Sequence, residues 1–329
     1  MKIAIVSPAS SGPRSGNRHT AGRWAKFLRD SGHKVSLATR WESGDEDILI
    51  ALHARKSYAS IDRFHAARPG APLIVVLTGT DLYRDIRINP DARRALDLAS
   101  RLIVLQERGL RELARRHRAK TRVIYQSADV QFPHAPPARC FRVVVIGHLR
   151  MEKDPFRAAL ALARLPERHD VEVVHLGAAL TPDMRKSAER WMKREPRYRW
   201  LGSKPHGETM HWLARSHVLV VSSVMEGGAN VICEAARIRV PVLASRVSGN
   251  IGMLGSDYAG YFALSDDKAL ARLLERAARN PKYYRRLKDA VVTRRPLFAP
   301  SAGQRRAASG AGKQRCGTNP EAHRLSRHP

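Results

Sequence analysis

The nine residues Glu226-Gly-Gly-Ala-Asn-Val-Ile-Cys-Glu234 are the most informative segment of this chain. They follow the apolar run Val218-Leu-Val-Val221, which is typical of a buried strand, and they lead into a helical pattern. If the chain is helical from Asn230, a rise of about 1.5 Å per residue places the two carboxylates roughly 12 Å apart. The paired carboxylates of glycosidases lie only about 5 to 9.5 Å apart. These two glutamates are therefore better suited to holding opposite ends of one long ligand.

Apolar runs typical of strands alternate with helical patterns on both sides of this segment. In the first part of the chain they cover residues 3–6, 35–38, 48–52, 73–77, 102–105 and 123–125, and in the second part residues 141–146, 171–176, 198–201, 218–221 and 242–244. A helix is expected over residues 20–31, because Gly32 is a typical C-terminal glycine. The alternation predicts an α/β fold with parallel, doubly wound sheets.

The prolines of residues 132–137 interrupt this rhythm and are typical of a linker. We therefore expect a first Rossmann-like domain over residues 1–133 and a second over residues 134–300, with the active site in the cleft between them. Residues 301–329 lose the periodicity and are rich in Gly, Ser, Arg and His. We expect them to form a basic, disordered tail.

Length and composition agree with this organisation. A chain of 329 residues with 43% apolar residues is sufficient for two hydrophobic cores. No stretch approaches the roughly 18 apolar residues of a membrane span, and the N-terminus is typical of a buried strand and not of a secretion signal. We therefore expect a cytoplasmic protein. Cys140, Cys233 and Cys316 lie far apart and predict neither a disulfide framework nor a zinc site.

The formal net charge of +29 has two interpretations. A field of this size attracts anions to clefts and also binds nucleic acids and membranes without specificity. Alternatively, arginines spread over solvated helix faces give the same total without a dedicated role. No zinc-finger or aromatic-stacking motif accompanies the charge, so we expect no nucleic-acid partner.

Three motifs together resemble the large family of retaining glycosyltransferases with the GT-B fold. They are the two glutamates with glycines between them, the segment Gly147-His-Leu-Arg-Met-Glu-Lys-Asp154, and the segment Val240-Pro-Val-Leu-Ala-Ser-Arg-Val-Ser-Gly-Asn250. The resemblance covers about residues 1–295. It implies two tandem Rossmann-like domains that face a cleft, and transfer of a sugar from a nucleotide-sugar, whose length matches the separation of the glutamates.

Two further segments resemble a narrower branch, the selenosugar synthase of selenoneine biosynthesis. They are Ser11-Gly-Pro-Arg-Ser-Gly-Asn-Arg-His-Thr20 and Leu77-Thr-Gly-Thr-Asp-Leu-Tyr83. This resemblance implies transfer of a sugar, expected to be N-acetylglucosamine, from its UDP ester to selenophosphate. The UDP-sugar is then the donor substrate, and we expect no cofactor and no metal ion, because cationic side chains can replace the metal.

In the second domain, the resemblance implies a phosphate-binding loop after residues 141–146. Gly147 admits close backbone approach, and the cations His148, Arg150 and Lys153 would neutralise a departing pyrophosphate. The wider family usually carries Arg at the position of His148, so Arg150 is expected to supply the missing charge. A solvated side chain is the alternative for Lys153 and for His148.

The resemblance places Glu226 near the sugar hydroxyls, as a member of the catalytic group, and Glu234 on the ribose hydroxyls, which suit acceptor-only carboxylates. A turn-capping role for Glu226 and an exposed helix position for Glu234 are the alternatives. The other expected donor-binding residues lie near strand ends, where backbone N–H groups are free for phosphate. They are Gly227, Gly228, Asn230, Ser248, Gly249 and Asn250. A plain loop is the alternative for residues 248–250.

In the first domain, a strand-to-helix loop rich in glycine, hydroxyl groups and basic side chains is typical of an anion site. Such a site suits a small phosphate-like acceptor. The expected acceptor-binding residues are Arg14, Gly16, Asn17, Arg18, His19, Thr20, Thr78, Gly79, Thr80 and Asp81. For Asp81, capping of a following helix is the alternative.

Two other functions remain open at this point. The first keeps the fold and the donor but uses a carbohydrate or lipid acceptor, with a basic first domain on an anionic membrane. The second is a non-catalytic basic protein that binds nucleotides or nucleic acid, which only the charge favours.

Overall fold

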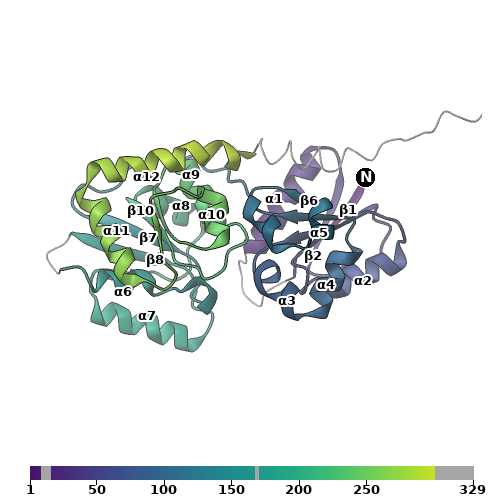
Figure 1. Ribbon diagram of the computed structural model, residues 1–329, viewed down its shortest axis with the longest axis horizontal. Coiled ribbons are helices and arrows are strands. Elements are labelled where there is room, and N and C mark those ends of the chain that lie inside the picture. Colours follow the sequence, from purple (N-terminus) through teal and green to yellow (C-terminus); the bar gives the residue numbers. More distant parts are fainter. Residues whose placement is uncertain (9–15, 167–169, 301–329) are drawn as a thin grey trace, which may run out of the picture.

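The computed structural model describes residues 1–8, 16–166 and 170–300. Figure 1 shows two lobes, the first purple to blue and the second teal to yellow, and each contains a parallel sheet flanked by helices. Arg14, Cys316 and the expected tail over residues 301–329 lie outside the described residues.

The first lobe is built on a six-stranded sheet with the order β2-β1-β3-β4-β5-β6, and all neighbouring strands are parallel. Its strands are β1 (Lys2–Val6), β2 (Lys34–Ala38), β3 (Ile48–Leu52), β4 (Leu73–Leu77), β5 (Arg101–Val104) and β6 (Thr121–Val123). Its helices are α1 (Gly16–Asp30), α2 (Tyr58–Ala67), η1 (Asp81–Asp85), α3 (Ile86–Ile88), α4 (Pro90–Leu98), η2 (Glu107–Glu112) and α5 (Arg115–Ala119).

The second lobe contains another six-stranded parallel sheet, with the order β12-β11-β10-β7-β8-β9. Its strands are β7 (Phe141–Ile146), β8 (Val171–Leu176), β9 (Tyr198–Trp200), β10 (Val218–Val221), β11 (Val242–Ser245) and β12 (Tyr261–Phe262). Its helices are η3 (Met151–Lys153), α6 (Arg157–Leu162), α7 (Pro182–Arg194), α8 (His206–Ala214), α9 (Asn230–Ile238), α10 (Ser248–Leu254), α11 (Asp267–Arg279), α12 (Pro281–Arg294) and η4 (Arg295–Phe298).

The sequence explains why these segments adopt these structures. Strands β3 and β10 are continuous apolar runs with every residue buried, as expected for the middle of a parallel sheet covered on both faces. Helix α11 buries Leu270 and Leu274 on one face and exposes basic residues on the other. Asn280 caps α12 by accepting a hydrogen bond from the Tyr283 N–H at 2.9 Å.

The α/β fold with two doubly wound sheets is confirmed. Two details of the expectation were wrong. The strand expected over residues 123–125 is β6 (Thr121–Val123), and the short edge strand β12 (Tyr261–Phe262) was not predicted. A strand of two residues carries too little alternation to be detected from its apolar pattern.

The segment after β6 joins the two lobes. Tyr125, Ala128 and Val130 pack in the core of the second lobe, and the Ala135 N–H donates to the Ala214 carbonyl at 3.0 Å. The end of the described chain returns to this segment, because the Ala128 N–H donates to the Phe298 carbonyl at 3.0 Å. The expected boundary between residues 133 and 134 therefore lies within a segment whose side chains already belong to the second core.

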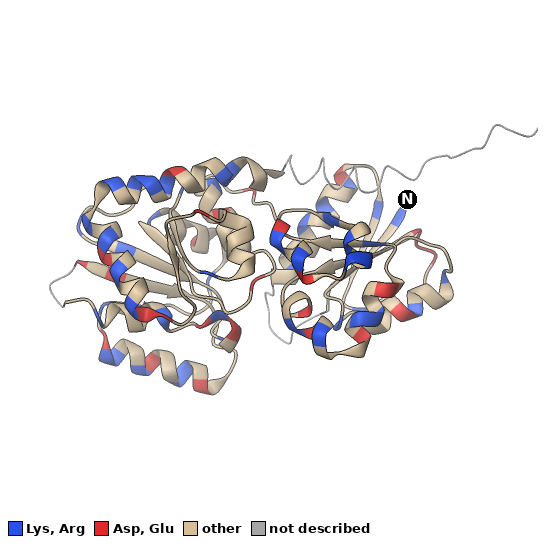
Figure 2. Ribbon diagram, viewed as in Figure 1, with Lys and Arg blue, Asp and Glu red and all other residues tan. Residues whose placement is uncertain are grey.

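Basic side chains are distributed over the helices of both lobes (Figure 2), which agrees with a general surface charge. Among the helices that the structure describes, none combines the length and the apolarity that a bilayer span requires.

Candidate functional site

Each sheet has a point where consecutive strands leave in opposite directions, and ligands of open α/β sheets bind there, at the carboxyl ends. In the second sheet β7 lies between β10 and β8, so this point is formed by the loops after β7 and β10. The first of these loops carries the motif of residues 147–154, and the second contains the start of the motif of residues 226–234, which continues into α9. In the first sheet β1 lies between β2 and β3, so the loop after β3 has the equivalent position.

Lys153 and Glu226 meet at the carboxyl end of the second sheet. The Lys153 Nζ forms an ion pair with Glu226 Oε1, and Ser223 Oγ donates to the same oxygen at 2.6 Å. Glu226 is 8% exposed, so its carboxylate depends on these two partners for charge and hydrogen bonding. The structure thus brings together two residues that the sequence assigned to one site.

A small cavity of about 20 Å³ adjoins this pair, and Gly147, Lys153, Ser223 and Glu226 are among its lining residues. This volume has room for about one water molecule. Pockets for drug-sized ligands measure about 300–1,000 Å³. A long ligand therefore does not fit within this cavity alone.

Gly147 directly follows β7, and His175 contacts its carbonyl. The His175 Nε2–H donates to the Gly147 carbonyl at 3.2 Å, and His175 Nδ1 lies 2.9 Å from the Tyr198 hydroxyl. Burial lowers the pKa of His175 to about 4, so the ring is neutral at physiological pH. His148 faces the neighbouring loop, where its Nδ1 accepts from the Ala178 N–H at 3.1 Å, and Arg150 is exposed.

Glu234 lies on α9, and its carboxylate accepts a hydrogen bond from His206 Nε2 at 3.0 Å. The Glu234 side chain is 13% exposed. His19, at the start of α1 in the first lobe, reaches the same place, because its ring lies 6.1 Å from that of His206. Residues of both lobes therefore gather around Glu234.

The two lobes touch through glycines. A Cβ on Gly227 would collide with the Thr78 carbonyl, and a Cβ on Gly79 would lie 3.3 Å from the Gly227 N. A Cβ on Gly228 would lie 2.6 Å from the Leu105 Cβ. Only glycine permits this approach of the two backbones, so the loop after β10 lies directly against the loop after β4.

Thr20, which we expected to bind the acceptor, is buried and hydrogen-bonded within the protein. The residue is 1% exposed, its Oγ1 donates to the Gly16 carbonyl at 3.0 Å, and it accepts from Gln126 Nε2 at 2.7 Å. Thr20 therefore connects α1 to the segment that joins the lobes. Of the other residues expected here, Gly16, Arg18 and His19 are exposed and Asn17 is half-buried.

Asp81, which we also expected to bind the acceptor, has partners within the protein as well. It is fully buried, and its carboxylate accepts hydrogen bonds from three backbone N–H groups, those of Thr78, Gly79 and Ala54, at 2.8–3.2 Å. All three donors precede Asp81 in the chain, so the carboxylate does not cap the following helix either. Its role is to fix the backbone of the Thr78–Gly79–Thr80 loop against Gly227.

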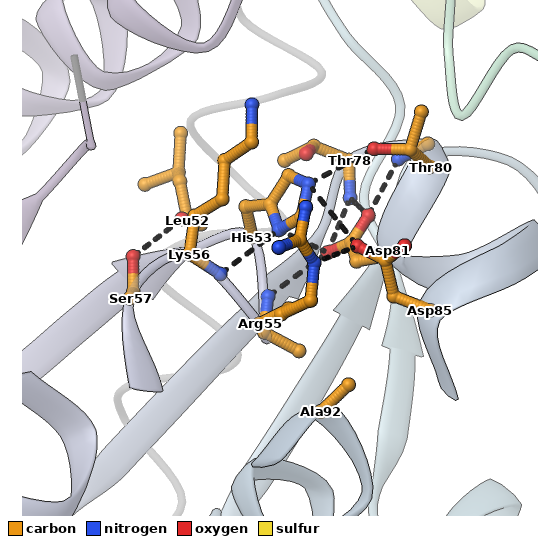
Figure 3. A network of polar contacts seen from close by, with 12 residues as sticks. Leu52, His53, Arg55, Lys56, Ser57, Thr78, Thr80, Asp81, Asp85 and Ala92 are labelled. Carbon is orange, nitrogen blue, oxygen red and sulfur yellow. Dashed lines mark hydrogen bonds and ion pairs between the residues drawn. The ribbon is translucent and has the colours of Figure 1, made fainter. Parts of the chain in front are cut away.

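His53 extends this network (Figure 3) and was not predicted. It directly follows β3 and has a left-handed φ of 75°. A non-glycine residue adopts this conformation at a cost in conformational energy. Its Nδ1 accepts from the Lys56 N–H at 3.3 Å, so its Nε2–H donates to Thr80 Oγ1 at 2.9 Å. Burial lowers the pKa of His53, and Asp85 accepts from Arg55 Nε at 2.7 Å nearby. Backbone strain stored at a switch point is typical of functional sites.

Residues 230 and 248–250 have structural partners. Asn230 Oδ1 accepts from Arg23 at 2.7 Å, across the two lobes. Ser248 is hydrogen-bonded to Tyr83, whose pKa burial raises to about 12. Gly249 is packed on the Glu226 backbone, and the Asn250 amide donates to the Ser245 carbonyl at 3.0 Å from a fully buried position. Asn250 therefore supports this loop from inside.

Sequence reasoning missed Arg23, Gln126, His53 and His206. Each is defined by a partner that is distant in the chain, for example 207 positions for Arg23 and Asn230. The topology provides one usable signal, since His53 directly follows β3 at the switch point of the first sheet.

A larger hollow of about 380 Å³ lies at the amino ends of β1 and β2. Its lining includes Asp45 and Asp47, which have the Asp-x-Asp spacing of many metal-binding motifs. However, Asp45 is ion-paired with Lys2, and Asp47 accepts from the Lys2 N–H at 2.8 Å. Ligands of parallel sheets bind at the opposite edge. Within the described ranges, no cluster of three or more His, Cys, Asp or Glu side chains has a geometry that fits a metal ion.

Comparison with known proteins gives the same fold. HepE from Anabaena, solved in complex with UDP-glucose, superposes with a TM-score of 0.75 at 18% identity, covering 94% of this chain and 99% of HepE. Sucrose-phosphate synthase from Thermosynechococcus elongatus gives 0.76 at 16% identity, covering 94% and 97%. At these identities, the similarity establishes the GT-B fold alone.

Sequence comparison is more specific. The glycosyltransferase 1 domain-containing protein 1 of Xenopus tropicalis is 25% identical over 326 residues, covering 87% of this chain and 90% of the relative. The pattern of the family described as glycosyl transferases group 1 matches residues 128–293, half of this chain, and contains the Lys153, Glu226 and Glu234 segments. The chain therefore belongs to the group 1 family of glycosyl transferases.

Proposed function

We propose that this chain transfers a sugar from a UDP-sugar, with the donor on the second lobe and the acceptor on the first. The meeting of Lys153 and Glu226 at the switch point of the second sheet carries this proposal. The complex of HepE with UDP-glucose supports a uridine nucleotide as donor.

The donor would lie along the loops after β7 and β10. Glu234, already oriented by His206, would accept hydrogen bonds from the ribose hydroxyls. The pyrophosphate would lie between Lys153 and the Gly227–Gly228 backbone at the start of α9, where free N–H groups and the helix dipole favour an anion. Glu226, released from Lys153 by the incoming phosphate, would then accept from the sugar hydroxyls.

Rate acceleration would come from positioning and charge. As the bond between the anomeric carbon and the phosphate oxygen breaks, negative charge develops on the departing UDP, and Lys153 stabilises it in a site of low dielectric. Exposed Arg150 and half-buried His148, on the same loop, would assist. Contact between the lobes would exclude water and limit hydrolysis of the donor.

For the acceptor we propose selenophosphate, with N-acetylglucosamine as the sugar and retention at the anomeric carbon. Selenium attacks the anomeric carbon, the carbon–oxygen bond breaks, and its electron pair leaves with UDP. Water then hydrolyses the selenium–phosphorus bond, which yields the selenosugar and phosphate. The motifs at residues 11–20 and 77–83 support this choice, and the first turn of α1 presents exposed Arg18 and His19 and contains no acidic residue.

A carbohydrate or lipid acceptor is the second candidate, and one observation favours it. Met151 is 75% exposed and Leu180 is 46% exposed, on two loops joined by a bridge between Leu149 and Ala179 at the carboxyl end of the second sheet. Exposed apolar side chains at the mouth of a site suit an acceptor with an apolar part.

Product analysis separates these candidates. Purified protein is incubated with a panel of UDP-sugars and fresh selenophosphate under reducing conditions, and UDP and selenium compounds are followed by mass spectrometry. A selenium-bearing sugar is the expected product. Transfer only to carbohydrate or lipid acceptors would rule out selenophosphate as the acceptor and favour the second candidate. Failure to use or bind any UDP-sugar would refute the proposal that the donor is a UDP-sugar.

A further inference from the structure

Arg23, on α1 of the first lobe, donates to three acceptors in two segments that are distant in the sequence. Its guanidinium donates to the Ser127 carbonyl, to Gln126 Oε1 at 3.1 Å and to Asn230 Oδ1 at 2.7 Å. Gln126 and Ser127 belong to the segment that joins the lobes, and Asn230 is the first residue of α9 in the second lobe. One side chain thus connects the first lobe, the connecting segment and the donor loop.

Asn230 lies two residues after Gly228, the second of the two glycines that bring the lobes together. Because Gly227 and Gly228 lie against Thr78 and Leu105 with no space for a Cβ, the position of Asn230 fixes how this loop rests on the first lobe. The proximity continues at the start of α1, where a Cβ on Gly16 would lie 3.7 Å from Asn230 Nδ2.

The role of Arg23 is better explained by the geometry that its hydrogen bonds impose than by any stability that they add. All three acceptors of Arg23 are neutral, its Nε is buried, and the described residues offer that atom no hydrogen-bond partner. A buried cation without a carboxylate in contact is expensive, and an apolar side chain of similar volume is often as stable. What only the planar guanidinium provides is a set of hydrogen bonds in fixed directions.

We propose that Arg23 is a positioning residue that latches Asn230, and with it the Gly227–Gly228 segment, to the first lobe, so that closure of the lobes and ordering of the donor loop are one event. The proposal extends the proposed function, because the segment it orders is the one assigned to the donor pyrophosphate. Arg23 and Asn230 lie in different lobes, so any separation of the lobes breaks their contact.

Hydrogen exchange of the ligand-free protein tests the latch without any substrate. In Arg23→Gln, we expect the backbone amides of residues 227–232 and 126–128 to exchange about 10-fold faster or more, the usual effect of losing a charged hydrogen bond. Exchange in β7 and β8 stays unchanged. The matched control is Lys26→Gln on the same helix, whose side chain is 72% exposed and forms an ion pair with Asp30.

Asn230→Ala provides a second variant that removes only the partner in the other lobe. It should accelerate exchange at residues 227–232 and leave residues 126–128 protected, and it decides the question if Arg23→Gln does not fold. At residues 227–232 the double variant should add little to either single variant, since both remove the same contact between Arg23 and Asn230. Unchanged exchange at residues 227–232 in both single variants, or a uniform increase over both sheets, would overturn the latch.

A calorimetric titration with UDP links the latch to the donor. Arg23→Gln should weaken UDP binding about 10-fold or more, whereas Lys26→Gln should not. UDP binding that Arg23→Gln leaves unchanged would contradict the coupling of closure to donor binding. If UDP fails to bind the unaltered chain, the proposed function fails, and the exchange experiment still decides on the latch.

Discussion

The Lys153 ammonium and the Glu226 carboxylate lie 73 positions apart in the sequence and form an ion pair at the carboxyl end of the second sheet. Their loops follow two adjacent parallel strands, β7 and β10, which explains how distant motifs come to share one site. The Lys153 side chain is partly exposed, at 24%, whereas the Glu226 side chain is nearly buried, at 10%. An anion entering from the cleft can therefore reach the lysine first.

Replacing Lys153 by Met should lower kcat about 10²–10³-fold, because the charge on departing UDP loses its main partner. The change in KM for the donor should be smaller. Steady-state kinetics with the preferred UDP-sugar measures both. Lys186→Met, at an exposed position on α7, is the control. A Lys153 variant with normal turnover would refute the assignment.

Glu234→Ala should raise the KM for the donor about 10-fold or more, with a smaller effect on kcat, since a charged acceptor of ribose hydrogen bonds is lost. His206→Ala should act in the same direction but less, because it only orients Glu234. Glu189→Ala, on an exposed face of α7, serves as the control. Unaltered donor affinity in Glu234→Ala would exclude the ribose role.

Arg18→Ala should impair use of the acceptor and leave donor affinity intact, because Arg18 is exposed at the start of α1 on the acceptor side. Initial rates are measured while each substrate is varied in turn. Arg29→Ala, at the other end of the same helix, controls for the general loss of a surface charge. An equal loss toward both substrates would mean that Arg18 only supports the fold.

Gly227→Ala should separate the lobes, because the new Cβ meets the Thr78 carbonyl. We expect kcat/KM to fall by at least 10-fold while the free energy of unfolding changes by only about 1–3 kcal/mol, the usual cost of overpacking. Gly207→Ala on α8 has no heavy atom within 4 Å of the added Cβ and should retain full activity. Equal activities of the two variants would argue against functional contact between the loops.

Acid should destabilise the protein through His175. Its pKa is about 4 in the folded chain and 6.5 without burial, so the unfolded chain binds the extra proton between these values. The contribution of His175 to the free energy of unfolding is fully present above pH 6.5 and falls by about 1.4 kcal/mol per pH unit as the pH drops toward 4. Urea unfolding at several pH values measures the slope. His175→Gln should have a smaller slope, and an identical slope would show that His175 does not titrate on unfolding.

The sequence was sufficient for the sheets because the strands of a covered parallel sheet are continuous apolar runs, as in β3 and β10. It failed for β12, which is only two residues long. The position of the two proposed donor loops was also predictable, because a motif that follows a strand must lie at the carboxyl edge of the sheet. Gly147 and Glu226 both lie there.

The direction of individual side chains was not predictable. Thr20 in the first turns of α1 and Asp81 at the start of η1 lie at the correct edge, but both side chains turn inward. They bind backbone or side-chain groups of the first lobe and the connecting segment. Arg23 and His53 obtain their roles from partners that only the folded chain brings near. Such contacts leave no periodic pattern, so no local rule detects them.

A calorimetric titration of the purified chain with UDP, and in parallel with uridine, tests the central claim most directly. The account predicts saturable binding of one UDP per chain and much weaker binding of uridine, because Lys153 and the start of α9 contact the pyrophosphate. Absence of saturable UDP binding, or equal affinity for uridine and UDP, would contradict it.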